Sequence, residues 1–306
     1  MCETEKKKGQ SGEEALSRIR SSAVGLNVSE EELALFHVGK EQEWELPING
    51  RMIHLYVYYP EETMEKYPAF VNLHGGGFVK GHRAQDVVFC RNICQNGHCA
   101  VFDIDYHTAP EYRYPYALNE VYDAVSYLWE HAEELSIDRE RLVIGGHSAG
   151  GNLTLGAAFL AQERGGFEPA GLVVDYPAVD LKQDPSEKRG AGAPDIKPPI
   201  EDCIRYNDWY IDEKYREEPT ASPVYASEEQ LRNLPPVLLI MAGHDVLGEE
   251  AERLAAKMIF AGATVIAKRV LEAYHGFVVR RAKGYEEAEK LIFPFLSLAR
   301  RTEKQE

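Results

Sequence analysis

The residues best suited to do chemistry lie at positions 146–150 (GHSAG). An apolar run precedes them at 142–144 and an apolar-periodic segment follows at 153–160, so the pattern predicts a strand, a sharp turn and a helix. A serine at such a turn projects its hydroxyl out of the fold, and a glycine on each side lets strand and helix approach closely. The helix would direct its N–H groups at the place where an oxyanion forms. Ser148 is therefore the candidate nucleophile; the alternative is a glycine-rich turn without a catalytic role.

A nucleophilic serine needs a base to take its proton, and the base needs a third group to hold its tautomer. In open parallel sheets, such groups lie beyond the carboxyl ends of strands. Asp245 and His275 each follow closely after an apolar run. We predict Asp245 as the acid and His275 as the base. The alternatives are Asp175 or Asp180 for the acid, and His244 for the base.

An oxyanion site is the fourth requirement, and residues 74–78 (HGGGF) follow another apolar run. Three consecutive glycines allow a loop to expose its N–H groups. We expect the oxyanion donors to be the N–H of Ala149 together with N–H groups of this loop. We interpret His74 as a brace for the loop rather than a reactant, and Phe78 as pocket wall or core.

The elements that must position these residues can be read from periodicity. Residues 43–46 and 53–58 alternate with a period of two around Asn49-Gly50, which predicts a β-hairpin. Beyond it, short apolar runs alternate with helical patterns, which is typical of an α/β fold with a mostly parallel sheet. The runs are residues 69–73, 100–104, 142–144, 171–174 and 237–241. Residues 264–270 predict the last strand, and the final helix contains Pro294, where we expect a kink or a break.

The composition and net charge of the chain argue against some classes of partner. The chain has 306 residues, 44% hydrophobic and 27% charged, with a formal charge of −16, so it should fold and should repel nucleic acid and anionic membranes. We find no apolar segment that would serve as a signal peptide or membrane span, and we expect a cytoplasmic protein with its five cysteines reduced. Cys90 and Cys94 could supply two metal ligands by spacing, but we interpret them as small buried hydrophobes.

Two stretches do not follow the strand–helix rhythm. Residues 1–40 are charged, with weak helical patterns at 13–20 and from Ser29. Residues 184–199 are rich in Pro, Gly, Lys and Asp and lead into a polar aromatic stretch at 203–215. We interpret the second region as an insertion rather than core.

Seven segments occur in order across residues 53–280 and together resemble the hormone-sensitive-lipase-like branch of the α/β-hydrolases, close to bacterial acetyl esterases and carboxylesterases. They are residues 74–78 (HGGGF), 105–111 (DYHTAPE), 146–151 (GHSAGG), 222–223 (SP), 234–236 (LPP), Asp245 and 275–277 (HGF). That branch usually has Asp or Thr where His147 stands and Arg-Leu where His107-Thr108 stand. These departures leave the reaction class intact and the substrate preference open.

The resemblance implies an α/β-hydrolase fold: a mostly parallel eight-stranded sheet flanked by helices, with a helical cap. It implies one domain, in which cap segments 1–40 and 180–220 accompany a catalytic core of residues 41–179 and 221–306. The order Ser, Asp, His matches that of the family. Gly76 and Gly77 would donate the loop N–H groups of the oxyanion hole.

These observations favour a serine carboxylesterase that hydrolyses small, short-acyl esters through an acyl-enzyme, without a metal or organic cofactor. Phe78 and His147 are candidate substrate-binding residues. Tyr206, Trp209 and Tyr210 are candidates too, because they could stack on a sugar, which would suit a deacetylase of acetylated sugars; simple cap packing is the alternative. A non-catalytic ligand-binding protein on the same fold is the rival from another class. A homodimer is the oligomeric state we consider.

Overall fold

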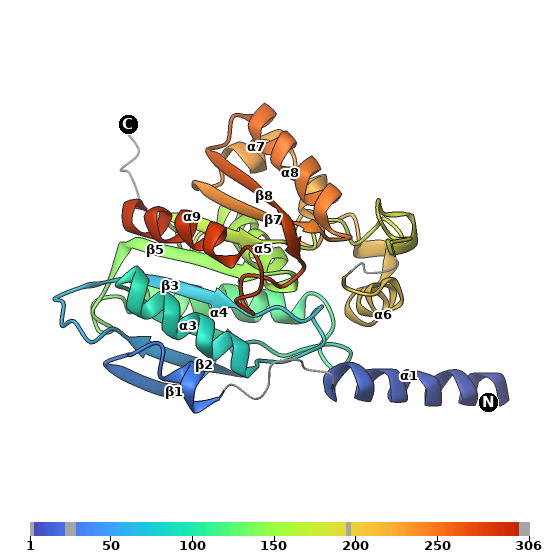
Figure 1. Cartoon of the computed structure of the whole chain (residues 1–306), viewed down its shortest axis with the longest axis horizontal. Helices are drawn as coiled ribbons and strands as arrows, with labels where there is room; N and C mark the ends of the chain where they lie inside the picture. The colour runs from blue at the N-terminus through green and yellow to red at the C-terminus, as the bar shows by residue number, and fades with distance from the viewer. Residues whose placement is uncertain (1–2, 22–28, 194–196, 300–306) are drawn as a thin grey trace.

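The computed structural model describes residues 3–21, 29–193 and 197–299. Within them, eight strands form one sheet in the order β1-β2-β4-β3-β5-β6-β7-β8 (Figure 1). The strands are β1 Lys40–Ile48, β2 Arg51–Tyr59, β3 Tyr67–Leu73, β4 Ala100–Asp105, β5 Ile137–His147, β6 Gly171–Asp175, β7 Val237–His244 and β8 Val265–Tyr274. The helices are α1 Glu3–Ser21, α2 Glu30–Leu33, α3 Ala84–Gly97, α4 Tyr116–Glu130, α5 Ala149–Arg164, α6 Ile200–Tyr210, α7 Glu228–Arg232, α8 Gly248–Ala261 and α9 Tyr285–Leu298.

The sheet begins with the predicted hairpin, and most of its remaining strands are parallel to one another. β1 and β2 pair antiparallel across Asn49 and Gly50, whose positive φ angles of 48° and 74° suit a two-residue turn. β2 also pairs antiparallel with β4, and every pairing from β4 to β8 is parallel. The mostly parallel eight-stranded sheet expected from the sequence is confirmed. Its carboxyl ends therefore meet at one edge.

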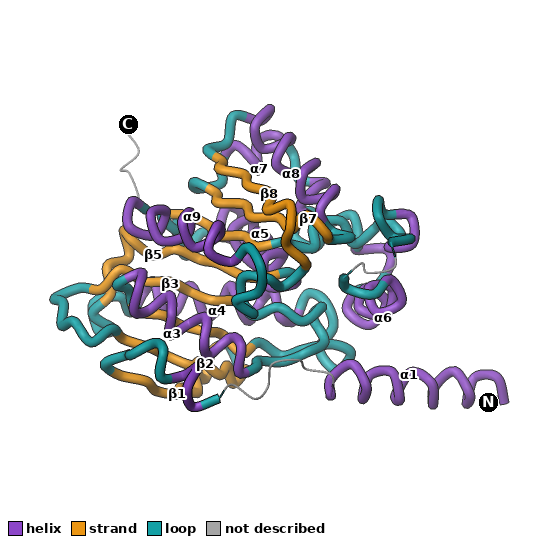
Figure 2. Tube along the Cα trace, viewed as in Figure 1, coloured by secondary structure: helices purple, strands orange, loops and turns teal. Residues whose placement is uncertain are grey.

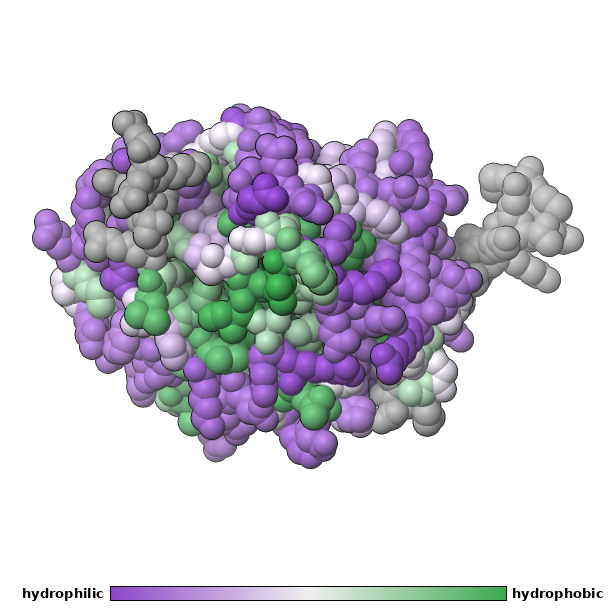
Figure 3. Space-filling model, turned by 90° about the horizontal axis from the view of Figure 1, so that it is seen from above, coloured by the Kyte–Doolittle hydropathy of each residue, from purple (hydrophilic) through white to green (hydrophobic). Residues whose placement is uncertain are grey.

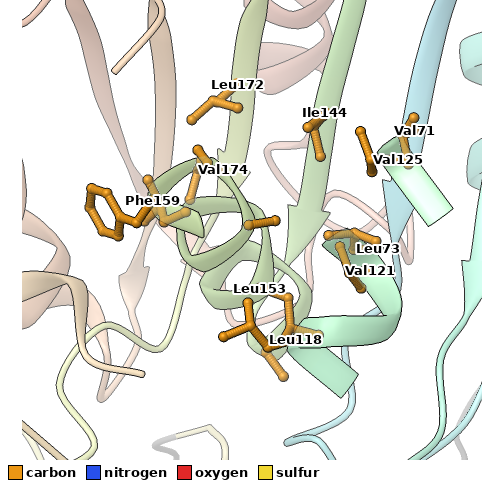
Figure 4. Packing of buried hydrophobic residues seen from close by; sticks show 14 of the residues in the cluster. Val71, Leu73, Leu118, Val121, Val125, Ile144, Leu153, Phe159, Leu172 and Val174 are labelled. Carbon is orange, nitrogen blue, oxygen red and sulfur yellow. The ribbon is translucent and has the colours of Figure 1, made fainter. Parts of the chain in front are cut away.

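Helices cover both faces of the sheet, as Figure 2 shows. One face packs against α4, α5 and α8, and the other against α3 and α9. A separate hydrophobic core lies on each face. Val71 of β3 belongs to the core on the first face and its neighbour Phe70 to the core on the second, because successive side chains of a strand point to opposite faces. Figure 4 shows Val71 and Leu73 beside Val121 and Val125 of α4. Burying each such aliphatic side chain contributes about 1.5–3 kcal/mol, so this packing fixes the spacing of strands and helices.

Two elements differ from expectation. β8 extends to Tyr274, which brings its carboxyl end directly to His275. We expected a kink or a break at Pro294, and α9 continues through this residue without a break. Pro294 is exposed, so the carbonyl that loses its hydrogen bond can reach water, while Ile292 and Leu296 on the same helix are buried. Their burial offsets the cost of the proline.

The segments predicted to form a cap lie in different places. α6 lies beyond the carboxyl ends of the strands, and α1 passes below it in Figure 1. Arg18 of α1 joins α6 through an ion pair with Asp202 at 2.6 Å. α2 instead lies beside β1, and His37 after it donates its N–H to Gln95 of α3.

No described helix combines the length and the apolar character that crossing a membrane requires. Cys90 and Cys94 lie in α3 with both side chains buried, and burial raises the pKa of the Cys94 thiol to about 12. Within the described residues, no group of three His, Cys, Asp or Glu side chains is arranged to hold a metal ion. The expectation that Cys90 and Cys94 are small buried residues therefore agrees with their packing.

Candidate active site

Ser148, His275 and Asp245 lie in hydrogen-bonding sequence at the carboxyl edge of the sheet. The Nε2 atom of His275 lies 2.9 Å from the Oγ atom of Ser148, and its Nδ1 atom lies 2.7 Å from the Oδ2 atom of Asp245. The three residues directly follow β5, β8 and β7. Because these parallel strands end at the same edge, residues up to 127 positions apart meet there. This arrangement allows a base to take the serine proton while a carboxylate orients the ring.

The backbone of Ser148 has the conformation expected of a sharp strand-to-helix turn. Its φ is 56° and its ψ is −113°, a strained combination for a residue with a side chain. Its N–H donates to the carbonyl of Asp175 at 2.9 Å, and its own carbonyl accepts from Asn152 at 3.1 Å. A Cβ atom on Gly150 would lie 1.9 Å from the carbonyl oxygen of Leu73, so only glycine permits this approach.

The carboxylate of Asp245 has a separate partner for each oxygen. Its Oδ2 faces His275, and its Oδ1 accepts the N–H of Leu247 at 2.9 Å. The alternative acids face elsewhere. The Oδ2 of Asp175 lies 3.0 Å from the Nδ1 of His147, and that of Asp180 lies 2.6 Å from an Nη2 atom of Arg253.

The alternative base also faces away from the serine. His244 is exposed and its ring stacks on Tyr274 with centroids 4.8 Å apart. Of the histidine pair considered from the sequence, only His275 is in contact with Ser148.

The loop after β3 lies beside Ser148 and carries the predicted oxyanion donors. Gly76 and Gly77 have φ angles of 135° and 63°, which glycine adopts without strain. A Cβ atom on Gly77 would lie 2.5 Å from the ring of Tyr206, so α6 packs tightly against this loop. On the other side of Ser148, the 16-residue helix α5 begins at Ala149. The loop after β3 and the first residue of α5 thus both line the cavity at Ser148, which is where donors to an oxyanion would be needed.

A buried network braces the loop from below. The ring of His74 stacks on Tyr106 at 4.1 Å, and its Nδ1 lies 2.9 Å from the carbonyl of Gly75. Its Nε2 lies 3.4 Å from Asp105. Burial alone would raise the pKa of Asp105, but the hydrogen bond and charge of His74, with His82, lower it to about 2. The geometry supports the bracing role we inferred for His74.

His82 and Asp103 belong to this network and were missed from the sequence. The Nε2 of His82 lies 2.7 Å from Asp103, which also accepts a hydrogen bond from Asn72 at 2.7 Å. Burial would lower the pKa of His82, but the charge and hydrogen bond of Asp103 raise it to about 9. A carboxylate in the middle of an apolar strand, as in residues 100–104, is the signal that could have revealed the pair.

A cavity of about 360 Å³ opens above Ser148. Phe78, His147 and Tyr206 line it, as predicted. Trp209 and Tyr210 do not line it, so the predicted stacking wall is not formed by these two residues. Tyr210 is buried with its ring stacked on Phe78 at 3.7 Å, and Trp209 packs against the core. Burying the apolar faces of these rings against other side chains is more favourable than leaving them in an open cavity.

The two positions that depart from the family pattern lie in different environments. His147 lines the cavity but is only 1% exposed, and its ring forms a T-shaped pair with Phe89 at a centroid distance of 4.4 Å. His107 lies outside the cavity, in a shallow hollow, where its Nδ1 is 2.7 Å from Glu120. His107 therefore does not line the cavity above Ser148.

A family model described as the alpha/beta hydrolase fold matches residues 70–279. The chain belongs to the α/β-hydrolase fold family. The match covers the turn at Ser148, the loop after β3, Asp245 and His275. It also agrees with the resemblance to the hormone-sensitive-lipase-like branch.

Other members of this fold are similar along most of the chain. The esterase LipI of Mycobacterium tuberculosis is 28% identical over 225 residues, which are 72% of this chain and 70% of LipI. An arylesterase of Saccharolobus solfataricus is 29% identical and is covered over 75% of its length, with 78% of this chain. Among solved structures, an esterase of Pyrobaculum calidifontis superimposes with a TM-score of 0.82 at 28% identity, covering 93% of this chain and 92% of that one.

Proposed function

We propose that this α/β-hydrolase is a serine carboxylesterase that hydrolyses small, short-acyl esters through an acyl-enzyme intermediate. The hydrogen-bonded series Ser148, His275 and Asp245, open to a cavity, is the observation that carries the proposal. The relatives named as esterases and an arylesterase support the reaction class. The rival ligand-binding protein would need neither a base nor an acid, and the short distances from His275 to Ser148 and Asp245 therefore favour the esterase.

The mechanism follows from the geometry. Ser148 attacks the ester carbonyl while His275 takes its proton, and Asp245 stabilises the imidazolium that results. The N–H groups of Gly76, Gly77 and Ala149 stabilise the oxyanion. His275 then gives the proton to the leaving alcohol. Water, deprotonated by the same histidine, attacks the acyl-serine and releases the acid.

The cavity suits a small ester. Each methylene that enters an apolar pocket contributes about 0.8 kcal/mol, close to fourfold in kcat/KM, until the pocket ends. A 360 Å³ cavity shared by the acyl and alcohol groups ends early. The cap that limits it is formed, in our proposal, by the end of α1 and by residues 180–220, within a single domain.

A series of 4-nitrophenyl esters tests the proposal. We expect kcat/KM to be greatest between about two and six acyl carbons and to fall at least about tenfold by twelve, because longer chains must clash or stay solvated. Ser148→Ala measures the background. A maximum at twelve carbons or longer, or a jump in rate when the ester forms an emulsion, would indicate a lipase. No hydrolysis of any ester would favour the ligand-binding rival.

The homodimer and the cytoplasmic location remain predictions. Figure 3 shows an apolar patch on the face that carries α8 and β8. The exposed large hydrophobic residues of these two elements include Ile259, Phe260, Ile266 and Leu271. Because β8 is an edge strand, this face is where we would place a second copy. Light scattering during size-exclusion chromatography decides between monomer and dimer.

A further inference from the structure

The cavity above Ser148 is lined with positive charge, although the whole chain has a formal charge of −16. Six cationic side chains line it: Arg18, Lys80, Arg83, Lys188, Lys197 and Arg280. Asp202 is the one carboxylate that lines it within the described residues. Charges of one sign around a cavity with low-dielectric walls concentrate ligands of the opposite sign.

Three of the six cations are paired with carboxylates and hold the structure together. The pairs are Arg18 with Asp202, Arg83 with Asp86, and Lys188 with Glu250. Arg83 also donates to the carbonyl of Gly75 at 2.9 Å, which anchors the loop after β3. Their charges are already balanced by carboxylates of the protein, so we look for the ligand-binding cation elsewhere in the lining, at Arg280.

Arg280 lies at the rim of the cavity beside the catalytic base. Its Cζ would be 3.1 Å from a Cβ atom on Gly276, and its Nη1 lies 3.5 Å from the carbonyl of His275. The side chain is exposed. No ion pair joins it to a carboxylate within the part of the chain that the structure describes. Its planar guanidinium therefore has donors available to a ligand at the place where the ester must bind.

Lys80 lines the same cavity, next to the glycine loop after β3. A Cβ atom on Gly76 would lie 2.8 Å from the Cβ of Lys80. Burial lowers the pKa of the Lys80 ammonium, and the charges of Arg83 and Arg280 lower it further, to about 8. The positive charges of Lys80, Arg83 and Arg280 are thus close enough to repel one another. An anion that binds between them would reduce this repulsion.

We propose that the natural ester carries a carboxylate, which Arg280 binds at the rim, with Lys80 alongside, while the ester carbonyl lies at Ser148. A guanidinium matches the two oxygens of a carboxylate with paired N–H donors. Apolar side chains such as Leu181, Leu247 and Val279 line the same cavity and can hold the remainder of the substrate. This inference rests on the proposed esterase function and specifies its substrate class.

Two matched pairs of esters test the proposal. In 4-acetoxybenzoate and 4-acetoxybenzamide, the charge difference is on the alcohol side. In mono-4-nitrophenyl glutarate and its methyl ester, it is on the acyl side. For each pair we would measure the ratio of kcat/KM for the anionic ester to that for the neutral ester. Comparing this ratio between wild type and Arg280→Gln cancels the intrinsic reactivities, because they are the same for both enzymes.

We expect Arg280→Gln to lower this ratio by about tenfold in at least one pair, the lower range for a hydrogen bond to a charged group at an exposed site. The matched control is Lys283→Gln. It removes the same charge three residues away, where Lys283 is 73% exposed and pairs with Glu272 outside the cavity. The control should leave both ratios unchanged. Raising NaCl from about 0.05 to 0.5 M should lower the wild-type ratio, because salt screens the attraction.

A change of less than fivefold with Arg280→Gln in both pairs would overturn the proposal, as would an equal change with Lys283→Gln. If Arg280→Gln does not fold, the proposal is tested by the salt dependence of the wild-type ratio and by the variant Lys80→Gln. A ratio that neither salt nor this variant lowers would overturn it. Hydrolysis of the neutral esters distinguishes the two levels of inference. If they are hydrolysed without any charge preference, the substrate class is wrong and the esterase function stands. If none of the four is hydrolysed, the esterase function itself fails.

Discussion

Replacing Asp245 by Asn should reveal how the base is oriented. The side-chain shape is kept, but one carboxylate oxygen becomes an NH₂ group. The Oδ1 position accepts the N–H of Leu247 at 2.9 Å, so the amide oxygen should stay there. The NH₂ group would then face the Nδ1 of His275, which must become the acceptor. The ring proton would move to Nε2, which faces Ser148 and could no longer take the serine proton.

The size of the effect follows from two costs. Flipping the amide would restore the tautomer of His275 but place an NH₂ against the N–H of Leu247, which costs about 1–3 kcal/mol. Even then, a neutral amide stabilises the imidazolium less than a carboxylate does, by another 1–3 kcal/mol or so. Together these costs, about 2–6 kcal/mol, correspond to a loss of about 30-fold to 3 × 10⁴-fold in kcat.

The assay is steady-state hydrolysis of 4-nitrophenyl butyrate, with circular dichroism to show that the variant is folded. Asp180→Asn is the matched control, because Asp180 is also buried but pairs with Arg253. Its kcat should stay within about tenfold of wild type. If Asp180→Asn abolished activity and Asp245→Asn remained within tenfold of wild type, our assignment of the acid and the tautomer argument would both be wrong.

Three further predictions concern the same site. Ser148→Ala and His275→Ala should each lower kcat by roughly 10⁴-fold or more, and the double variant should be little worse, because the residues act as a unit; additive losses in a rate assay would contradict this. Activity should fall as the pH is lowered from 8 to 5, because a base that already carries a proton cannot accept the serine proton; a flat rate over this range in folded enzyme would exclude a histidine base. His82 has its pKa raised to about 9, so its stabilising contribution is complete below about pH 6.5 and is lost as the pH rises through 9. Urea unfolding should therefore show the free-energy difference between wild type and His82→Gln shrinking by about 2–3 kcal/mol from pH 6.5 to 9; a constant difference would refute the His82–Asp103 ion pair.

Local rules explain why much of the fold could be predicted. The hairpin at Asn49-Gly50 and the alternation of apolar runs with helical segments depend on neighbours a few residues apart, so sequence spacing reveals them. Pro294 shows the limit of such rules. A helix-breaking residue was tolerated because α9 packs against the sheet, and that packing involves residues far away in the chain.

The sequence by itself determined where the chemistry starts: the spacing around Ser148 requires a sharp turn between a strand and a helix. It left Asp175, Asp180 and Asp245 as alternative acids. Strand order and the direction of each side chain at a shared edge decide which one faces His275, and no local spacing encodes them.

Tertiary structure alone also decided what surrounds the serine. It buries Tyr210 against Phe78 instead of leaving it in the cavity, and it brings Lys80 and Arg280 to the same opening. These two cations are 200 positions apart, and the charge of the chain as a whole is negative. The formal charge of the whole sequence does not say where the charged side chains lie. The electrostatic potential in a cavity depends on the few side chains that the fold places around it.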